Sequence, residues 1–345
     1  MSAYTSRIGV SIPMLDQPYP KLSELAALAD EAEFESVWDY EIYRNPFIAH
    51  AVNACATRRI KLATGVAAAA GRSPFEMANA AADIDELSGG RAILGLSAGE
   101  VGWADTYNGA DADHPLSRLR EYITIVRMVW RHLNDGGPAH FQGRFYKFDT
   151  PEYNSWGVRH LTRPSIPIYV GCVKPRMLQM AGELADGVIT YFTTPQFITE
   201  HILPNIAQGA RKAGRDPAQT DLAALVVCSV SDDRDEAIRR ARINVGHYAA
   251  FPPSSPQIEF AGLEDDRDYV VKKLLEDGPS SLETATSDEL LRTFAIAGTP
   301  EEAREQLAEL DGVLPHIVLH PPNVLPLNRT DSEEAFRAII RTFTL

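Results

Sequence analysis

Short apolar runs alternate along the chain with longer stretches of helical spacing. The apolar runs have the length of buried strands; they are residues 7–12, 36–40, 60–67, 92–99, 166–172, 187–191, 222–230 and 313–320. The other stretches repeat apolar residues every three or four positions, as amphipathic helices do; they are residues 21–34, 73–87, 116–133, 175–185, 196–213, 235–250, 300–310 and 332–343. This alternation predicts a parallel sheet whose strands are joined by helical crossovers.

Eight strands of this kind are the number that closes a (β/α)8 TIM barrel. The chain has 345 residues, which is enough for one barrel with insertions. An open, doubly wound sheet is the alternative, but the segment Gly9-Val10-Ser11-Ile12-Pro13 after the first strand lacks the GxGxxG fingerprint of that class. We therefore predict an α/β protein with one TIM-barrel domain over residues 1–345.

Three insertions interrupt the alternation. Residues 101–115 follow strand four and are polar and rich in Gly and Asp, and residues 251–288 follow strand seven and are rich in Pro and acids. Residues 136–163 precede strand five and contain HFQGRFYKF, which predicts a small hairpin with Gln142-Gly143 at the turn. Long irregular segments in a barrel are candidates for lids over its carboxyl-terminal mouth.

Composition narrows the class of partner. With 33 basic and 47 acidic residues the formal net charge is −14, which argues against nucleic acid and anionic membranes. No run approaches the ~20 apolar residues of a membrane helix, and the N-terminus has no signal-peptide pattern. The three cysteines form no CxxC pair. These features predict a cytoplasmic protein whose main partner is neither nucleic acid nor a membrane.

Active sites of TIM barrels lie at the carboxyl ends of the strands. The residues at those ends are Asp39, Tyr40, Thr64, Gly65, Val66, Ser97, Ala98, Gly99, Glu100, Gly171, Cys172, Val173, Lys174, Thr190, Tyr191 and His320. Small residues among them suit a flat aromatic ligand, because backbone can approach a ring closely. The helix that begins after Lys174 suits a phosphate. His316 and His320 can face one way, but no third ligand is evident, so we predict no metal site.

Four motifs in order carry a resemblance to a known family. They are LSGGR at 87–91, LGLSAGE at 94–100, MAGELADGV at 180–188 and AGTPEE at 297–302. With them the chain resembles the luciferase-like flavin and deazaflavin oxidoreductases, from Arg7 to about Asn323. The resemblance implies a (β/α)8 barrel, often as a homodimer.

The resemblance also implies where the cofactor lies. A non-prolyl cis peptide at Gly65–Val66 is expected against the back face of the ring, with Ala98 and Gly99 on the other side of the pocket. The cofactor phosphate is expected at Gly171, Cys172, Val173 and Lys174. The implied cofactor-binding set is completed by Asp39, Thr64 and Thr190.

Thr64-Gly65-Val66 and Ser97-Ala98-Gly99-Glu100 resemble the branch of the family that uses coenzyme F420. In sugar-phosphate dehydrogenases of that branch a histidine follows the aspartate that matches Asp39, and here Tyr40 stands in its place. The resemblance implies hydride transfer between the deazaflavin C5 and a C=C, C=N or carbonyl/alcohol substrate, with Glu100 or Tyr40 as the proton donor. The expected substrate pocket is formed by Trp103, Tyr107, Tyr191 and His320.

Three other functions are kept open by the sequence. The first is an FMN-dependent two-component monooxygenase on the same barrel. The second is a barrel lyase or hydrolase without a redox cofactor, which needs a Schiff-base lysine or a metal set at the strand ends; Lys174 instead opens a helix. The third is a cofactor-binding protein without catalysis, against which the presence of Glu100 counts.

Overall fold

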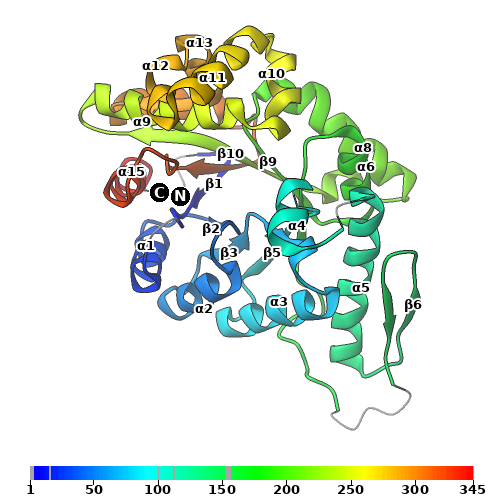
Figure 1. Cartoon of the computed structure of the whole chain (residues 1–345). Helices are drawn as coiled ribbons and strands as arrows, with labels where there is room; N and C mark the ends of the chain where they lie inside the picture. The colour runs from blue at the N-terminus through cyan, green and yellow to red at the C-terminus, as the bar shows by residue number, and fades with distance from the viewer. Residues whose placement is uncertain (1–3, 15–16, 100, 112, 152–156, 345) are drawn as a thin grey trace. The chain divides into compact units, whose positions relative to one another are not determined.

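The computed structural model describes residues 4–14, 17–99, 101–111, 113–151 and 157–344, with the backbone alone for 101–104. The chain divides into two compact units (Figure 1). Unit 1 comprises Met1–Asp39, Ile189–Pro204 and Asp221–Leu345, and unit 2 comprises Tyr40–Val188 and Asn205–Thr220. Each unit is described by itself.

Parallel strands form the centre of unit 2. They are β3 (Lys61–Thr64), β4 (Ala67–Ala68), β5 (Ala92–Ser97) and β8 (Ile168–Gly171). Strand β5 pairs with β3, β4 and β8. The predicted strand 60–67 is therefore two short strands, β3 and β4, which are separated by Gly65 and Val66.

Amphipathic helices accompany these strands; they are α2 (Pro46–Ala56), α3 (Pro74–Ser88), α5 (Pro115–Asp135), α6 (Pro175–Leu184) and α8 (Leu203–Lys212). The start of α3 follows its sequence signal, because the Ser73 hydroxyl accepts the Glu76 amide at 3.1 Å. The end of α3 is set by Gly89 in the left-handed region. Helix α2 was not predicted from the sequence.

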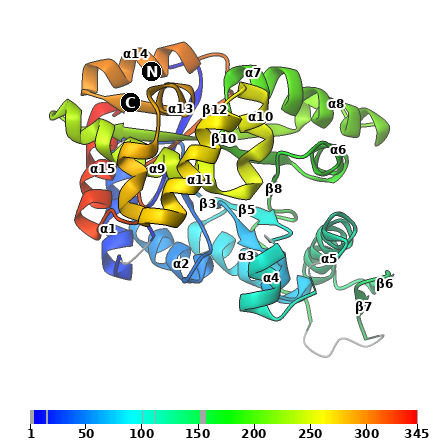
Figure 2. The same cartoon turned by 45° about the horizontal axis from the view of Figure 1, so that its top comes forward.

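The predicted hairpin is present as β6 (His140–Gln142) and β7 (Lys147–Asp149), beside α5 (Figure 2). The predicted turn at Gln142-Gly143 is wrong, since Gln142 still pairs with Lys147 and the Gly143 amide bonds the Tyr146 carbonyl at 2.9 Å. The reason is a tertiary contact. The Glu121 carboxylate of α5 accepts the amides of the three residues that follow Gly143, at 2.9, 2.9 and 3.0 Å.

The expectation of an irregular loop over residues 101–115 is wrong in part, because Val101–Asn108 forms helix α4. Residues 105–109 of this segment are all exposed. The eight residues of this helix are too few to show the hydrophobic period that reveals the longer helices in the sequence.

Unit 1 has a parallel sheet in the order β11, β10, β12, β1, β2. The strands are β1 (Arg7–Ser11), β2 (Ser36–Asp39), β10 (Asp221–Val230), β11 (Ala295–Gly298) and β12 (His316–His320), and β9 (Gly187–Tyr191) ends in this unit. Strand β11 was not predicted, because four small or apolar residues are too short for a periodic signal. The helices next to these strands are α1 (Tyr19–Glu31), α9 (Arg234–Ala250), α14 (Pro300–Leu310) and α15 (Arg329–Thr342).

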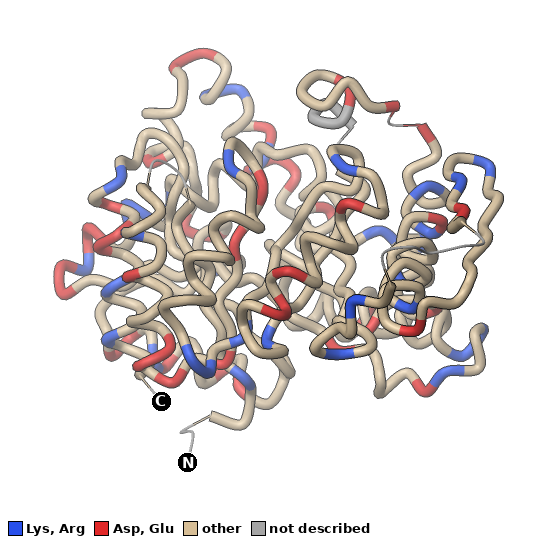
Figure 3. The backbone as a smooth tube through the Cα atoms, turned by 90° about the horizontal axis from the view of Figure 1, so that it is seen from below, with Lys and Arg blue, Asp and Glu red and all other residues tan. Residues whose placement is uncertain are grey.

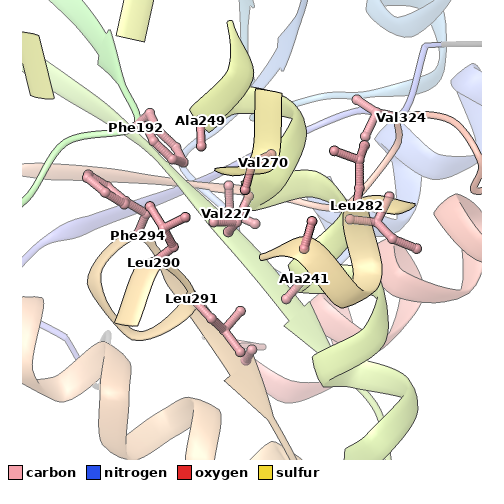
Figure 4. Close-up of a cluster of buried hydrophobic side chains, with 14 of the residues drawn as sticks. Phe192, Val227, Ala241, Ala249, Val270, Leu282, Leu290, Leu291, Phe294 and Val324 are labelled. Atoms are coloured by element: carbon pink, nitrogen blue, oxygen red, sulfur yellow. The ribbon is translucent and has the colours of Figure 1, made fainter. Parts of the chain in front are cut away.

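The insertion after strand seven is helical, so the expectation of an irregular segment over 251–288 is wrong. It forms α10 (Ser255–Ala261), α11 (Glu264–Asp277), α12 (Leu282–Ala285) and the start of α13 (Asp288–Phe294). Helices α11, α12 and α13 lie against α9, and α10 lies against α11 (Figure 1). Their buried apolar side chains form one cluster with residues of α9 and β10, in which Phe192 stacks on Phe294 at 4.0 Å (Figure 4). Helices α10, α12 and α13 have only 7, 4 and 7 residues, and α11 buries Val270 alone, so the helical period is weak in the sequence.

The strands predicted from the sequence are all present, and the chain has the (β/α)8 barrel fold. Strands four, five and seven of the prediction are β5, β8 and β10, so the two insertions and the hairpin lie where they were expected. The extent of the single domain stays a prediction. Acidic and basic positions are interspersed in the view of Figure 3. Within the described residues, no helix is long and apolar enough to cross a membrane.

The contact between Glu121 and the hairpin is testable. Its own burial raises the pKa of the Glu121 carboxyl, but the amides of Phe145, Arg144 and Tyr146 more than offset this, so the pKa lies below its usual range. We expect Glu121→Ala to speed hydrogen exchange of these three amides at least about tenfold, because each loses its charged acceptor. Glu183→Ala, which removes a carboxylate from α6, serves as the control. Unchanged exchange in Glu121→Ala would show that the hairpin does not need the carboxylate.

Candidate functional site

The strand ends of unit 2 finish at the same level. Ala67 of β4 pairs with Leu96 of β5, and Leu96 pairs in turn with Val170 of β8. The residues that follow this row are the small ones predicted from the sequence: Gly65 and Val66 precede β4, Ala98 and Gly99 follow β5, and Gly171 ends β8. The structure therefore brings these three groups to one edge of the sheet.

A close approach between β3 and β5 holds this edge together. The Thr64 hydroxyl donates to the Gly95 carbonyl at 2.7 Å and accepts the Gly95 amide at 2.9 Å. A Cβ atom at position 95 would lie 1.8 Å from the Thr64 carbonyl oxygen, so only glycine fits there. The Thr64 side chain, which was predicted to bind cofactor, thus bonds to the neighbouring strand.

The peptide bond between Gly65 and Val66 is cis. This confirms the expectation drawn from the family resemblance. It lies between β3 and β4, directly at the sheet edge described above.

A small hollow with a cavity volume of about 80 Å³, partly open to solvent, lies beside the end of β5. Its lining residues are Ala69, Ala70, Ala98, Gly99, Ala110, Asp111, Pro115, Arg118, Leu119 and Tyr146. The Arg118 guanidinium pairs with the Asp111 carboxylate and lies 4.5 Å from the centre of the Phe145 ring. The lining thus combines alanine and glycine, which leave backbone accessible, with the polar groups of Asp111, Arg118 and Tyr146.

The end of β8 leads directly into α6. Lys174 is exposed and occupies the N-cap position, so the free amides of the first helical turn follow it. Burial raises the pKa of the Cys172 thiol, which therefore stays protonated at neutral pH, and its sulfur lies 3.7 Å from the Val170 carbonyl oxygen. A helix start with a lysine can hold a phosphate, and the residues present fit a flat cofactor that carries one.

The predicted residues of unit 1 lie at other strand ends. Asp39, Tyr191 and His320 are the last residues of β2, β9 and β12, and Thr190 is fully buried in β9. His320 Nε2 lies 3.2 Å from the hydroxyl of Tyr248 on α9, whose ring centre lies 5.7 Å from that of Tyr191. The structure therefore brings Tyr191 and His320 together through Tyr248.

His320 is uncharged at neutral pH. Its side chain is 3% exposed. Burial lowers its pKa to about 4, and the nearby charge of His247 adds to this effect, whereas a hydrogen bond with Asn323 opposes it. A neutral imidazole can accept a hydrogen bond at one nitrogen and donate one at the other.

Several predicted residues are not placed among these groups. Glu100 lies outside the described residues, and so does the side chain of Trp103. Tyr107 of α4 is 60% exposed, and its ring lies edge-on to that of Tyr43 at 6.4 Å. Tyr40 follows β2 and is partly exposed.

Sequence reasoning missed three residues near the strand ends: Glu41, Arg72 and Tyr248. Glu41 follows Tyr40, so the sequence shows an acidic residue after strand two. No sequence pattern predicts that Glu41 pairs with Arg72. Tyr248 belongs to a predicted helix, and no signal indicates that it faces His320. Among the described residues, no three His, Cys, Asp or Glu side chains converge as a metal site would require.

Comparison with known proteins shows the family. A model of the luciferase-like monooxygenase family matches residues 3–316. The chain belongs to this family. A relative from Archaeoglobus fulgidus, described as 5,10-methylenetetrahydromethanopterin reductase, is 34% identical over 86% of this chain and 87% of its own length.

Solved structures of the family have the same fold. The coenzyme F420-dependent tetrahydromethanopterin reductase from Methanopyrus kandleri superposes with a TM-score of 0.80 over 99% of this chain and all of its own, at 25% identity. The oxygenating constituent of 3,6-diketocamphane monooxygenase from Pseudomonas putida, in complex with FMN, has a TM-score of 0.71 over 99% of this chain and 98% of its own. At 17% identity, the second likeness shows the fold alone.

The family resemblance and the enzyme class, an oxidoreductase, are confirmed by these comparisons. The reductase from M. kandleri, described as F420-dependent, supports coenzyme F420 as the cofactor. FMN stays the alternative that the sequence left open. The comparisons do not favour the lyase or hydrolase. The homodimer, the cytoplasmic location and the roles of individual residues stay predictions.

The low pKa of His320 predicts a pH-dependent stability. Because an unfolded histidine titrates near pH 6.5, the unfolded chain gains a proton there, while folded His320 gains one only near pH 4. Stability is thus present above about pH 6.5 and is lost as the pH falls toward 4. When the pH falls from 7 to 5, the unfolding free energy of the parent should decrease more than that of His320→Gln. We expect the two decreases to differ by up to about 2 kcal/mol.

Urea unfolding at both pH values measures this difference, and His140→Gln, at an exposed position, is the control. Parallel losses in the parent and His320→Gln would contradict the prediction. An NMR titration of His320 in the parent gives an independent value and needs no substitution.

Proposed function

We propose that the protein is a coenzyme F420-dependent oxidoreductase that transfers hydride between the deazaflavin C5 and a small organic substrate. The observation that carries this proposal is the level row of small residues at the ends of β4, β5 and β8, next to the Gly65–Val66 bond. A flat ring needs such a surface, because it binds where backbone can approach closely. The M. kandleri reductase, described as F420-dependent, supports the choice of cofactor.

The proposed cofactor site lies within unit 2. Gly65 and Val66 contact the back face of the ring, and Ala98 and Gly99 line the other side of the pocket. Position 99 requires glycine, because its backbone has a φ of +86°, which would strain any other residue. The phosphate lies at the segment from Gly171 to Lys174, where the first amides of α6 and the lysine provide donors and positive charge.

The bound deazaflavin supplies the hydride, and the chain supplies position, a proton and protection from water. Glu100 and Tyr40 are the proposed proton donors. A carboxyl can serve as the acid if burial raises its pKa toward the working pH. In unit 1, Tyr191 and the neutral His320–Tyr248 pair are proposed to contact substrate. Trp103 and Tyr107 of α4 stay candidates for the same role on the sequence alone.

For the substrate we propose a C=N centre of a reduced pterin as the first candidate. In a methylene-bridged pterin this centre forms when one C–N bond of the N–CH2–N bridge breaks and the released nitrogen takes a proton. The C=N centre that remains then accepts the hydride on its carbon. The proton requires an acid beside the site. The A. fulgidus relative, which is named for a methylene-bridged pterin, supports this choice over C=C and carbonyl substrates.

The cofactor is tested by parallel titrations of purified protein with F420 and FMN, followed by their fluorescence. We expect F420 to bind at least about tenfold more tightly. Lys174→Met should weaken F420 binding about tenfold, which corresponds to one charge-assisted contact. Lys212→Met, an exposed lysine on α8, is the control. Preference for FMN would replace the proposal with the monooxygenase, and binding of neither would refute a redox function.

The substrate is tested by following the oxidation of reduced F420 in the presence of methylenetetrahydromethanopterin, with acetone as the carbonyl comparison. We expect turnover with the pterin. Glu100→Gln should lower that turnover about 10²-fold, within the range of general acid catalysis, and leave F420 affinity unchanged. Turnover with acetone alone would contradict the C=N proposal, and full activity of Glu100→Gln would remove its role as the acid.

A further inference from the structure

Glu41 makes an unusual number of contacts to the segment that carries the Gly65–Val66 bond. Its own amide donates to the Val66 carbonyl at 3.3 Å. Its carboxylate Oε2 accepts the Ala68 amide at 2.8 Å. Residues 66–68 are therefore held at both ends by one residue, which lies after the end of β2.

Arg72 holds that carboxylate in place. Its Nη1 donates to Glu41 Oε2 at 2.8 Å and its Nη2 pairs with Oε1 at 2.7 Å, so the contact is bidentate. The Glu41 side chain is 20% exposed and the Arg72 side chain 12%. A bidentate pair that is largely withdrawn from water fixes both side chains in direction more firmly than a single contact does.

The arginine is itself fixed on two sides. Its guanidinium lies 5.4 Å from the centre of the Phe47 ring of α2, and its carbonyl accepts the Tyr122 hydroxyl of α5 at 3.1 Å. The position of residues 66–68 thus depends on a chain of contacts that begins on two helices of unit 2 and ends at the sheet edge.

We propose that Glu41 and Arg72 are positioning residues for the cofactor. They fix residues 66–68 in the position in which this segment contacts the ring. The inference rests on the proposed function and extends it to two residues that touch neither ring nor substrate. The pairing of Ala68 with Ser97 in β4 and β5 still allows the segment to tilt, because β4 has only two residues. The Glu41 carboxylate removes that freedom.

A merely structural ion pair would affect stability alone, so the test needs a second readout. Glu41→Gln keeps the shape of the side chain but loses the charge and one acceptor oxygen. Arg72→Lys keeps the charge but not the bidentate geometry. Glu183→Gln is the matched control, because Glu183 pairs with Arg120 at 2.5 Å and Lys212 at 2.8 Å, is 10% exposed, and lies on α6.

The expected result has two parts. Without cofactor, hydrogen exchange at the Ala68 amide rises at least about tenfold in Glu41→Gln and not in Glu183→Gln. With F420, the affinity falls about tenfold in Glu41→Gln and Arg72→Lys, and the absorption spectrum of the bound cofactor shifts, whereas Glu183→Gln changes the melting temperature alone.

Each failure has a distinct signature. Equal Ala68 exchange in Glu41→Gln and the parent overturns the positioning role, whatever the cofactor. Faster exchange with unchanged F420 affinity and spectrum shows that the pair stabilises the segment without positioning the ring, which also overturns it. A parent chain that binds neither F420 nor FMN overturns the proposed function, and with it the cofactor part of this inference.

Discussion

The close contact between β3 and β5 is the constraint on which the candidate site depends. Since Gly95 has no side chain, the Thr64 carbonyl can lie close to the Gly95 backbone. The Thr64 hydroxyl forms hydrogen bonds with both the carbonyl and the amide of Gly95. This contact sets the register of β5 against β3 and, through the same strand, against β4 and β8. A larger residue at position 95 would separate the strands, and the small residues at their ends would no longer lie level.

The resulting sheet edge is made mainly of small residues, and the nearby charged side chains lie beside it. Alanine and glycine at the ends of β4, β5 and β8 expose backbone, while Glu41 with Arg72 and Asp111 with Arg118 are paired beside it. Pairing lowers the cost of withdrawing the charges of Glu41 and Arg72 from water, whereas the Asp111 side chain stays 59% exposed. The edge itself is left as a surface suited to a flat ring. In such a site the cofactor carries the chemistry and the protein sets its position and surroundings.

Unit 1 shows how burial sets the state of a histidine. His320 ends β12, has a low pKa and bonds Tyr248 of α9. Helix α9 is held in turn by the helices of the insertion, through the apolar cluster that includes Phe192 and Phe294 (Figure 4). The insertion therefore contributes to the surroundings of a strand end, although it was expected to be an irregular segment.

The sequence alone was enough to predict the strands other than β11, most long helices and the family, because apolar periodicity and local motifs depend on residues that are neighbours in the chain. The strand-end residues followed from the predicted strands, and the Gly65–Val66 cis bond followed from the family resemblance. Only the tertiary structure decided that α4 and α10–α13 are helices, since such exposed or short segments carry no clear period. It also decided the partners of Glu41 and His320, because Arg72 and Tyr248 lie 31 and 72 positions away along the chain and meet them only through folding.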